Sequence, residues 1–288
     1  MSNQSEYDVR KYLKGRITAD LHCHTKYSDG SYSPKEVVFM AKTLNLKAVG
    51  ITDHDTIGGW LEAEQAGQNY GIEIIRGVEL NTDWMGKEVH ILGYEMDKQN
   101  VIIAEKLIEL GEAREERLKE ILIRLRALGI IISEEEVKEF ARGDSVGRPH
   151  IAQALIAKGY VKSVEEAFVR YLEIGAPAYV PRLKLTPEGA IRLIRQAGGV
   201  AVLAHPGLYR VEAGIKHWVE EGLQGIESIH SEHSEEDVAR YLKIGQNYHL
   251  IITGGSDFHG EKIKPNARMG KWGVDMTAVE QIRALVKK

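Results

Sequence analysis

The sequence predicts an α/β protein in which seven strands and their helices form a barrel with an inserted helical subdomain. Short apolar runs alternate with segments of helical period, which is typical of βα units. Histidine or acidic residues follow most of these runs, as expected where strand ends converge on one face of a barrel. One long helical pattern interrupts the alternation. With 288 residues and 43% hydrophobic composition, the chain can bury the core of one barrel with an insertion.

Seven apolar runs are the predicted strands, and most lead into residues that can bind metal. In chain order they are 17–21 before His22 and His24, 47–51 before His54, 74–78 before Glu79, 88–92 around His90, 200–204 before His205, 225–229 before His230, and 250–253 before Asp257 and His259. Helical period is clearest over 34–44, 187–196 and 235–244. We therefore expect parallel strands whose following loops meet at one mouth.

The first of these strand ends carries an H-x-H pair. Side chains alternate along a strand, so His22 and His24 point to one face while Cys23 points to the other, where it is expected to be buried. Asp29 follows on a polar loop. Neutral imidazole with carboxylate suits zinc, manganese or iron. An isolated pair could equally be two surface histidines, but histidines at the later strand ends favour a metal site.

The inserted subdomain is predicted for residues 97–181, which leaves 1–96 and 182–288 as the barrel. Apolar residues recur at three- and four-residue steps from Ile103 to Leu128, and Arg114 falls on the same stripe. Shorter helices are expected over 134–140, capped by Ser133, and over 149–158 and 164–173.

Composition and motifs exclude several classes of function. The formal net charge of −4 argues against binding of long duplex nucleic acid, which requires a basic face. A single cysteine excludes an internal disulfide framework. We see no membrane-length apolar run and no signal-peptide pattern, so a soluble cytoplasmic protein without a membrane partner is expected. Serine hydrolysis and ATP-driven chemistry lack a G-x-S-x-G or Walker motif.

Five motifs, taken in order, resemble those of the PHP superfamily, named for polymerase and histidinol phosphatase. They are the H-x-H with Asp29, Thr-Asp-His-Asp at 52–55, Gly-Val-Glu at 77–79, Ala-His-Pro at 204–206 and Ser-Asp-Phe-His at 256–259. The resemblance implies a distorted, TIM-like (β/α)7 barrel with two or three divalent ions at its mouth. The insertion, with Gly147-Arg148-Pro149-His150, resembles a branch of metal-dependent phosphoesterases that act on nucleoside 3′,5′-bisphosphates or trim short RNA from the 5′ end.

The resemblance also implies three metal positions, with manganese most expected and zinc or iron as alternatives. In this scheme His22, His24, Glu79 and Asp257 hold the first ion, Glu79 bridges to a second ion held by His90 and His205, and Asp29, His54 and His259 hold a third. The family often has histidine at the position of Asp29, although carboxylate is still a hard oxygen ligand. The positive charge of the ions would exceed the negative charge of the ligands, which favours an anionic substrate. The ions would also activate water for attack on phosphorus.

Other polar residues near the strand ends are candidates for catalysis. Asp53 is expected to orient a ligand imidazole, and Asp55 to cap a helix. Glu227, His230 and His233 form a cluster after the sixth strand. This cluster is either a solvated loop or the source of a general acid, with His230 or His233 as the donor.

Basic residues in or beside the insertion are the candidates for substrate binding. They are Arg148, His150, Arg182 and Lys184. The planar guanidinium of arginine matches phosphate, and Arg148 lies at a predicted helix N-terminus, where anions bind well.

These features favour a metal-dependent phosphoesterase for phosphate monoesters of small nucleotides or short oligonucleotides. A histidinol-phosphate phosphatase is the alternative, although so small a substrate does not need a helical cap. A non-catalytic PHP module is a second alternative, but all nine ligand positions are filled. Amidohydrolase barrels also open with H-x-H; however, no lysine here ends a strand where their bridging lysine would lie.

Overall fold

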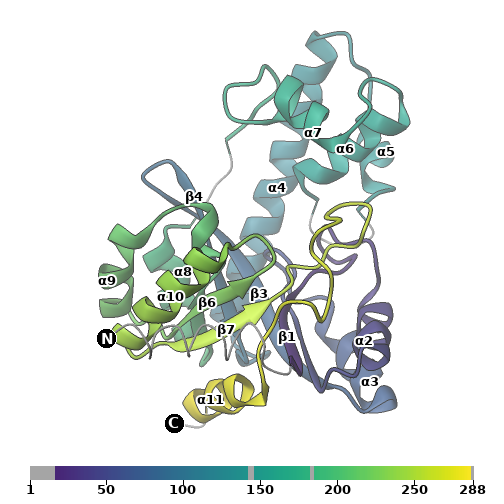
Figure 1. Ribbon diagram of the computed structural model, residues 1–288. Coiled ribbons are helices and arrows are strands. Elements are labelled where there is room, and N and C mark those ends of the chain that lie inside the picture. Colours follow the sequence, from purple (N-terminus) through teal and green to yellow (C-terminus); the bar gives the residue numbers. More distant parts are fainter. Residues whose placement is uncertain (1–16, 142–145, 182–184, 287–288) are drawn as a thin grey trace.

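The computed structural model describes residues 17–141, 146–181 and 185–286 (Figure 1). Arg182 and Lys184, two of the predicted substrate contacts, lie outside these ranges. Seven strands pair in sequence order in one sheet. They are β1 (Ala19–Cys23), β2 (Ala48–Ile51), β3 (Glu73–Trp84), β4 (Lys87–Tyr94), β5 (Val200–Leu203), β6 (Gly225–His230) and β7 (Ile251–Gly255).

The sheet curls until its last strand returns to its first. Beyond β7, the N–H of Asp257 donates to the carbonyl of His22 at 2.9 Å, and the N–H of His24 donates to the carbonyl of Phe258 at 2.8 Å. Gly255 permits this approach, since a Cβ there would lie 2.5 Å from the backbone nitrogen of His22. The predicted seven-stranded barrel is thus confirmed in a nearly closed form.

β4 differs from the predicted all-parallel arrangement. β3 does not end before Glu79 but runs on to Trp84, and the chain reverses at Met85 and Gly86, both with positive φ. β4 therefore pairs antiparallel with both β3 and β5, and the remaining neighbours are parallel. Because of this reversal, the first half of β4, with His90, lies at the mouth where the parallel strands end.

Helices cover the outside of the barrel (Figure 1). They are α2 (Pro34–Thr43), α3 (Trp60–Tyr70), α8 (Pro187–Gln196), α9 (Glu212–Glu220), α10 (Glu235–Asn247) and α11 (Met276–Val286), with a short 3₁₀ turn η2 (Pro206–Leu208) after β5. Ser33, Thr186 and Ser234 accept N-terminal backbone N–H groups and fix where α2, α8 and α10 begin. Their apolar faces pack on the strands and position the strand ends.

The insertion stands over the mouth of the barrel (Figure 1). It contains α4 (Val101–Ala127), α5 (Glu134–Lys138), α6 (Arg148–Ala157), α7 (Val164–Ala167) and a π-helical turn η1 (Phe168–Leu172). Ser133 caps α5 as predicted. Leu118 and later residues of α4 pack in a core of the insertion, whereas Ile103, Leu107 and Leu110 pack in the barrel core. We propose that residues 97–181 are one inserted unit, with α4 anchoring it to the barrel.

None of the helices in the described part of the chain is both long enough and apolar enough to cross a lipid bilayer.

Candidate metal centre

Glu79 lies at the centre of a buried group of histidines at the barrel mouth. Its Oε2 is 3.2 Å from Nε2 of His22 and 3.1 Å from Nε2 of His24. Its Oε1 is 2.7 Å from Nδ1 of His90 and 2.9 Å from Nε2 of His205. Oε2 also lies 3.2 Å from Nδ1 of His54. The two oxygens of one carboxylate thus face different groups of imidazoles, an arrangement that suits a carboxylate shared by two cations.

Asp257 completes the group around His22 and His24. Its Oδ1 is 3.5 Å from Nε2 of His22 and 3.2 Å from Nε2 of His24. Its Oδ2 points away and accepts a hydrogen bond from Nζ of Lys264 at 2.6 Å. Ligand atoms of His22, His24, Glu79 and Asp257 all lie within 4.8 Å of one another, so one cation can contact all four.

A second group surrounds Asp29 on the loop after β1. Oδ1 of Asp29 is 3.2 Å from Nε2 of His259, and its Oδ2 is 3.9 Å from Nε2 of His54. Atoms of His24, Asp29, His54 and His259 again lie within 4.8 Å of one another. The structure thus brings together all nine residues that the resemblance implied as ligands. His54, Glu79 and His90 form a further close set of donors, and His205 joins it through its contact with Oε1 of Glu79.

Burial and charge oppose each other in this cluster. Burial lowers the pKa of His24, but hydrogen bonds to Asp257 and Glu79 outweigh it and raise the pKa to about 10. Burial also lowers the pKa of His90, but the charge of Glu79 raises it to about 9. For Glu79 burial raises the pKa, yet the surrounding histidines hold it well below its ordinary value. Burial lowers the pKa of His54 to about 3 and that of His205 to about 4, so the raised values are confined to some of the rings. An ionised carboxylate beside His24 and His90, which hold protons, suits a site where a cation would replace those protons.

Glu227 on β6 positions two of these histidines. Both of its oxygens lie 3.1 Å from Nδ1 of His22, and Oε2 accepts the backbone N–H of His205 at 2.9 Å. The residue is fully buried. A carboxylate on Nδ1 fixes the tautomer in which Nε2 faces the metal. The sequence placed Glu227 in a polar cluster without this role; an acidic residue inside an apolar strand is the signal for such a buried partner.

Asp53 organises the loop that carries Asp29. Its carboxylate accepts the backbone N–H of Thr25 at 2.7 Å, the Thr25 hydroxyl at 2.8 Å and the Ser28 hydroxyl at 2.6 Å. Ser28 in turn lies 3.4 Å from Nδ1 of His24. Asp53 therefore acts on a histidine through Ser28, which makes it a positioning residue.

His230 and His233, the candidate general acids, make different contacts. The Nδ1 of His230 accepts the N–H of Glu232 at 3.2 Å, and its Nε2 lies 3.4 Å from Oδ2 of Asp257. In His233, Nε2 accepts the N–H of Gly207 at 3.1 Å and Nδ1 donates to the carbonyl of Ser228 at 3.0 Å. Both nitrogens of His233 are engaged by backbone groups, and an acid role for His230 or His233 stays a prediction.

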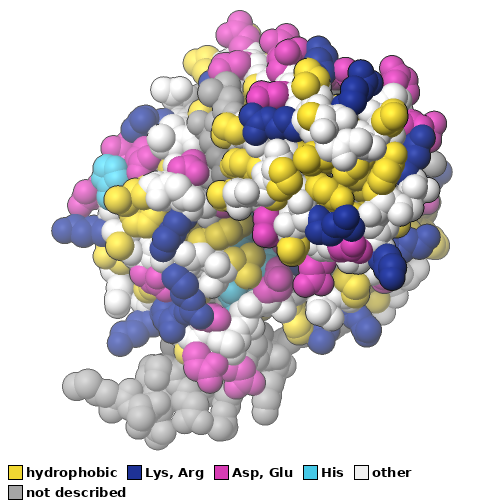
Figure 2. Space-filling view, turned by 90° about the horizontal axis from the view of Figure 1, so that it is seen from above, with side chains coloured by type: hydrophobic (Ala, Val, Ile, Leu, Met, Phe, Trp, Pro, Cys, Tyr) yellow, Lys and Arg dark blue, Asp and Glu magenta, His cyan; other side chains and the backbone are white. Residues whose placement is uncertain are grey.

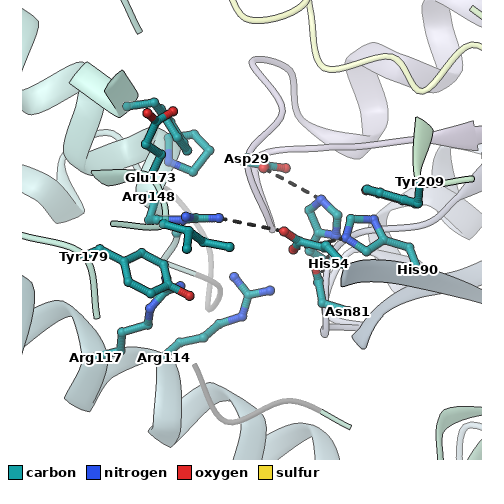
Figure 3. A pocket seen from close by; sticks show the side chains of 15 residues that line it. Asp29, His54, Asn81, His90, Arg114, Arg117, Arg148, Glu173, Tyr179 and Tyr209 are labelled. Carbon is teal, nitrogen blue, oxygen red and sulfur yellow. Dashed lines mark hydrogen bonds and ion pairs between the residues drawn. The ribbon is translucent and has the colours of Figure 1, made fainter. Parts of the chain in front are cut away.

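A cavity of about 500 Å³ adjoins the candidate metal ligands (Figure 3). Seen from above the insertion, histidine side chains lie in a hollow between the insertion and the barrel (Figure 2). The barrel contributes Asp29, His54, Asn81, Glu88, His90 and Tyr209 to its lining. The insertion contributes Arg114, Arg117, Arg148, Phe168 and Tyr179. Ligand imidazoles and arginines thus face each other across one pocket.

Arg148, the first residue of α6, lines this cavity. It donates to the carbonyl of Leu172 at 3.1 Å, and its guanidinium lies over the rings of Phe168 and Tyr179 at 5.2 and 5.8 Å. His150 behaves differently from the prediction: it is buried, its Nδ1 accepts the N–H of Gly147, and it does not line the cavity. It supports the start of α6, and that role conflicts with direct substrate contact.

Arg114 and Arg117 were not predicted as pocket residues. The carboxylate of Asp55 pairs with Arg114. The prediction that Asp55 caps a helix is wrong, because α3 begins at Trp60 and its N-cap is Gly59. Arg117 donates to the carbonyl of Val180 at 2.8 Å. An arginine on the apolar stripe of α4 was the available signal, because a buried charge requires a partner.

Comparisons with known proteins agree with this geometry. The sequence profile of the PHP domain matches residues 20–180, more than half of the chain. The chain belongs to the PHP family. The computed structure superposes on a Bifidobacterium adolescentis protein described as a metal-dependent phosphoesterase with a TM-score of 0.86 and 33% identity, covering 93% of this chain and 96% of that one.

Two curated relatives are similar over most of their length. The 5′-3′ exoribonuclease Rnm of Escherichia coli is 34% identical over 250 residues, which cover 84% of this chain and 85% of the relative. The 3′,5′-nucleoside bisphosphate phosphatase of Chromobacterium violaceum is 34% identical over 246 residues, which cover 83% and 86%. This PHP protein is therefore a metal-dependent hydrolase of the phosphoesterase class, as the sequence predicted.

Proposed function

We propose that this PHP protein hydrolyses nucleoside 3′,5′-bisphosphates, with trimming of short RNA from the 5′ end as a related activity. One observation carries the proposal: the metal ligands open into a pocket whose opposite wall holds Arg114, Arg117 and Arg148 beside aromatic rings. Guanidinium groups suit a phosphate that does not react, and aromatic rings suit a flat base. The names of the relatives support the same substrate class.

We also propose the ligand sets implied by the family resemblance, with manganese as the working metal. His22, His24, Glu79 and Asp257 would hold one ion, Glu79 with His90 and His205 a second, and Asp29, His54 and His259 a third. When bound, such ions lower the pKa of water and take up charge from phosphoryl and leaving oxygens.

The residues of the protein prepare this site in three ways. Glu227 holds Nδ1 of His22, which leaves Nε2 to face the ion. Lys264 holds Oδ2 of Asp257, which leaves Oδ1 to face the ion. Arg148 can hold the distant phosphate, and binding energy from that phosphate then orients the reacting one.

The test is a substrate panel with manganese-loaded protein. We expect kcat/KM to be about tenfold or more higher for a nucleoside 3′,5′-bisphosphate than for the matching 3′- or 5′-monophosphate. 5′-Phosphorylated RNA, histidinol phosphate and an aryl phosphate complete the panel. A preference for histidinol phosphate, or equal rates for bisphosphate and monophosphates, would refute the proposal.

Arg148→Gln tests the clamp, because glutamine can still donate to Leu172 but carries no charge. It should remove most of the bisphosphate preference and leave hydrolysis of the aryl phosphate nearly unchanged. Arg170→Ala is the matched control: Arg170 also lies in the insertion, pairs with Glu166 and does not line the cavity. An equal loss on every substrate in Arg148→Gln would mean that Arg148 only supports the fold.

A further inference from the structure

Glu88 is a carboxylate in a pocket that otherwise suits anions. It lies on β4 and lines the cavity, with about a third of its side chain exposed (32%). Its Oε1 is 3.3 Å from Nε2 of the metal-ligand candidate His90. Its Oε2 is 3.9 Å from Nη2 of Arg148. Glu88 thus lies between the predicted reaction centre and the predicted phosphate clamp.

A carboxylate at this point repels a phosphate group and favours a hydrogen-bond donor. Ionised glutamate is only an acceptor, so the part of the substrate that faces Glu88 must carry an O–H or N–H. It must also be uncharged or positive, because a second anion beside Glu88 would be disfavoured. Glu88 therefore marks the middle of the pocket as the place of a neutral donor.

The chemistry of a nucleoside 3′,5′-bisphosphate identifies that donor. Its sugar joins the two phosphates, so with one phosphate at the metal ligands and the other at Arg148 the sugar spans the position of Glu88. Both the 3′ and the 5′ oxygens are esterified. The 2′-hydroxyl is then the sole free hydroxyl of the sugar, whichever phosphate reacts.

We propose that Glu88 accepts a hydrogen bond from the 2′-hydroxyl of the substrate and thereby selects ribonucleotides over deoxyribonucleotides. This inference rests on the proposed function, since it assumes a nucleotide in the pocket. A hydrogen bond to a charged acceptor is among the stronger ones, so the selection should be about tenfold or more in kcat/KM.

The experiment compares adenosine 3′,5′-bisphosphate with its 2′-deoxy analogue, using manganese-loaded wild type, Glu88→Gln and Glu88→Met. Wild type should favour the ribonucleotide by about tenfold or more. Both variants should lose most of this ratio through slower turnover of the ribonucleotide, with Glu88→Met losing more because methionine lacks the amide oxygen. Glu173→Gln, which replaces another carboxylate lining the cavity, should leave the ratio unchanged.

The ratio separates recognition of the sugar from a structural role. Equal losses on both substrates in the Glu88 variants would overturn the inference, as would a wild type without sugar preference. A changed preference between adenine and uracil substrates, with the sugar ratio intact, would assign Glu88 to the base and also overturn it. The matching 3′-monophosphates and their deoxy analogues are measured in parallel. If wild type does not prefer bisphosphates but still shows a Glu88-dependent sugar ratio, the proposed function fails and this inference stands.

Discussion

The ion pair between Arg114 and Asp55 joins the insertion to the barrel, and its removal should strongly destabilise the protein. Nη2 and Nε of Arg114 donate to the same Oδ2 of Asp55 at 2.5 and 3.1 Å. Asp55 also accepts the backbone N–H of Asn81 at 3.1 Å and its Nδ2–H at 3.2 Å. The exposed fractions of the Arg114 and Asp55 side chains are only 8% and 3%. Both partners are therefore largely shielded from water.

The size of the effect follows from this burial. Removing one partner of a buried pair leaves an uncompensated charge, which costs about 3–5 kcal/mol of unfolding free energy. Arg114→Met keeps much of the apolar stem, and Asp55→Asn keeps the shape of the carboxylate. The double variant leaves no unpaired charge, so its loss should be smaller than the sum of the two single losses by about 2 kcal/mol or more.

Urea denaturation in the presence of a chelator measures these losses without a contribution from bound metal. The four tryptophans, Trp60, Trp84, Trp218 and Trp272, all lie outside residues 97–181, so their fluorescence reports on the barrel while circular dichroism reports on both parts. Lys119→Met, which breaks an exposed pair on the same helix, should leave the midpoint unchanged. A coupling energy near zero, or an unchanged midpoint for Arg114→Met, would refute the argument.

Three further predictions concern the metal centre. Chelation should abolish hydrolysis and manganese should restore it. Manganese binding at pH 8 should release protons, because the pKa values of His24 (about 10) and His90 (about 9) lie above that pH. The affinity for manganese should therefore fall as the pH is lowered, and calorimetry in several buffers measures both effects. The kcat of Glu79→Gln should be about tenfold or more lower than the kcat of Asp29→Asn. Equal losses of kcat at equal metal occupancy would contradict a bridging Glu79. Glu227→Gln should weaken manganese binding in equilibrium dialysis by about 10- to 100-fold, whereas unchanged affinity would leave Glu227 without the orienting role.

The clustering of the ligand candidates could be predicted from the sequence because each of them follows a simple rule. Strand alternation puts His22 and His24 on one face, and the convergence of strand ends brings His205 and Asp257 to the same mouth. These rules act over a few residues. They require only that each apolar run is a strand of a common barrel, and the structure meets this condition.

The β3–β4 hairpin could not be predicted by the same rules. Glu79 and Asn81 interrupt the apolar pattern, so the strand was expected to end before them, but both side chains are buried at the mouth of the barrel. Gly86 was the one sequence signal for the tight turn. Met85 also has a positive φ, but methionine rarely adopts this conformation and so does not indicate a turn. Polar residues that face the inside of a metal-binding barrel break the apolar pattern of a strand, so this part of the strand resembles a loop in the sequence.

The roles of Glu227 and Arg114 escaped prediction because their partners are distant in the chain. Glu227 lies 205 residues from His22, and Arg114 lies 59 residues from Asp55. A charged residue within an apolar strand or stripe indicates that a partner exists, but tertiary structure alone identifies it.

The contacts of Asp55 also connect the insertion with the metal centre. Asn81, which donates to Asp55, places its Nδ2 3.1 Å from Nδ1 of the ligand candidate His54. Arg114 thus reaches His54 through two residues, while its own side chain lines the cavity that faces the proposed second phosphate. A displacement of α4 would therefore move the cavity wall that holds Arg114 and the ligand candidate His54 together. For this reason changes at Arg114 should alter KM and kcat jointly. Changes at Arg148, which among the described residues contacts the insertion and Glu88, should act mainly on the proposed second phosphate.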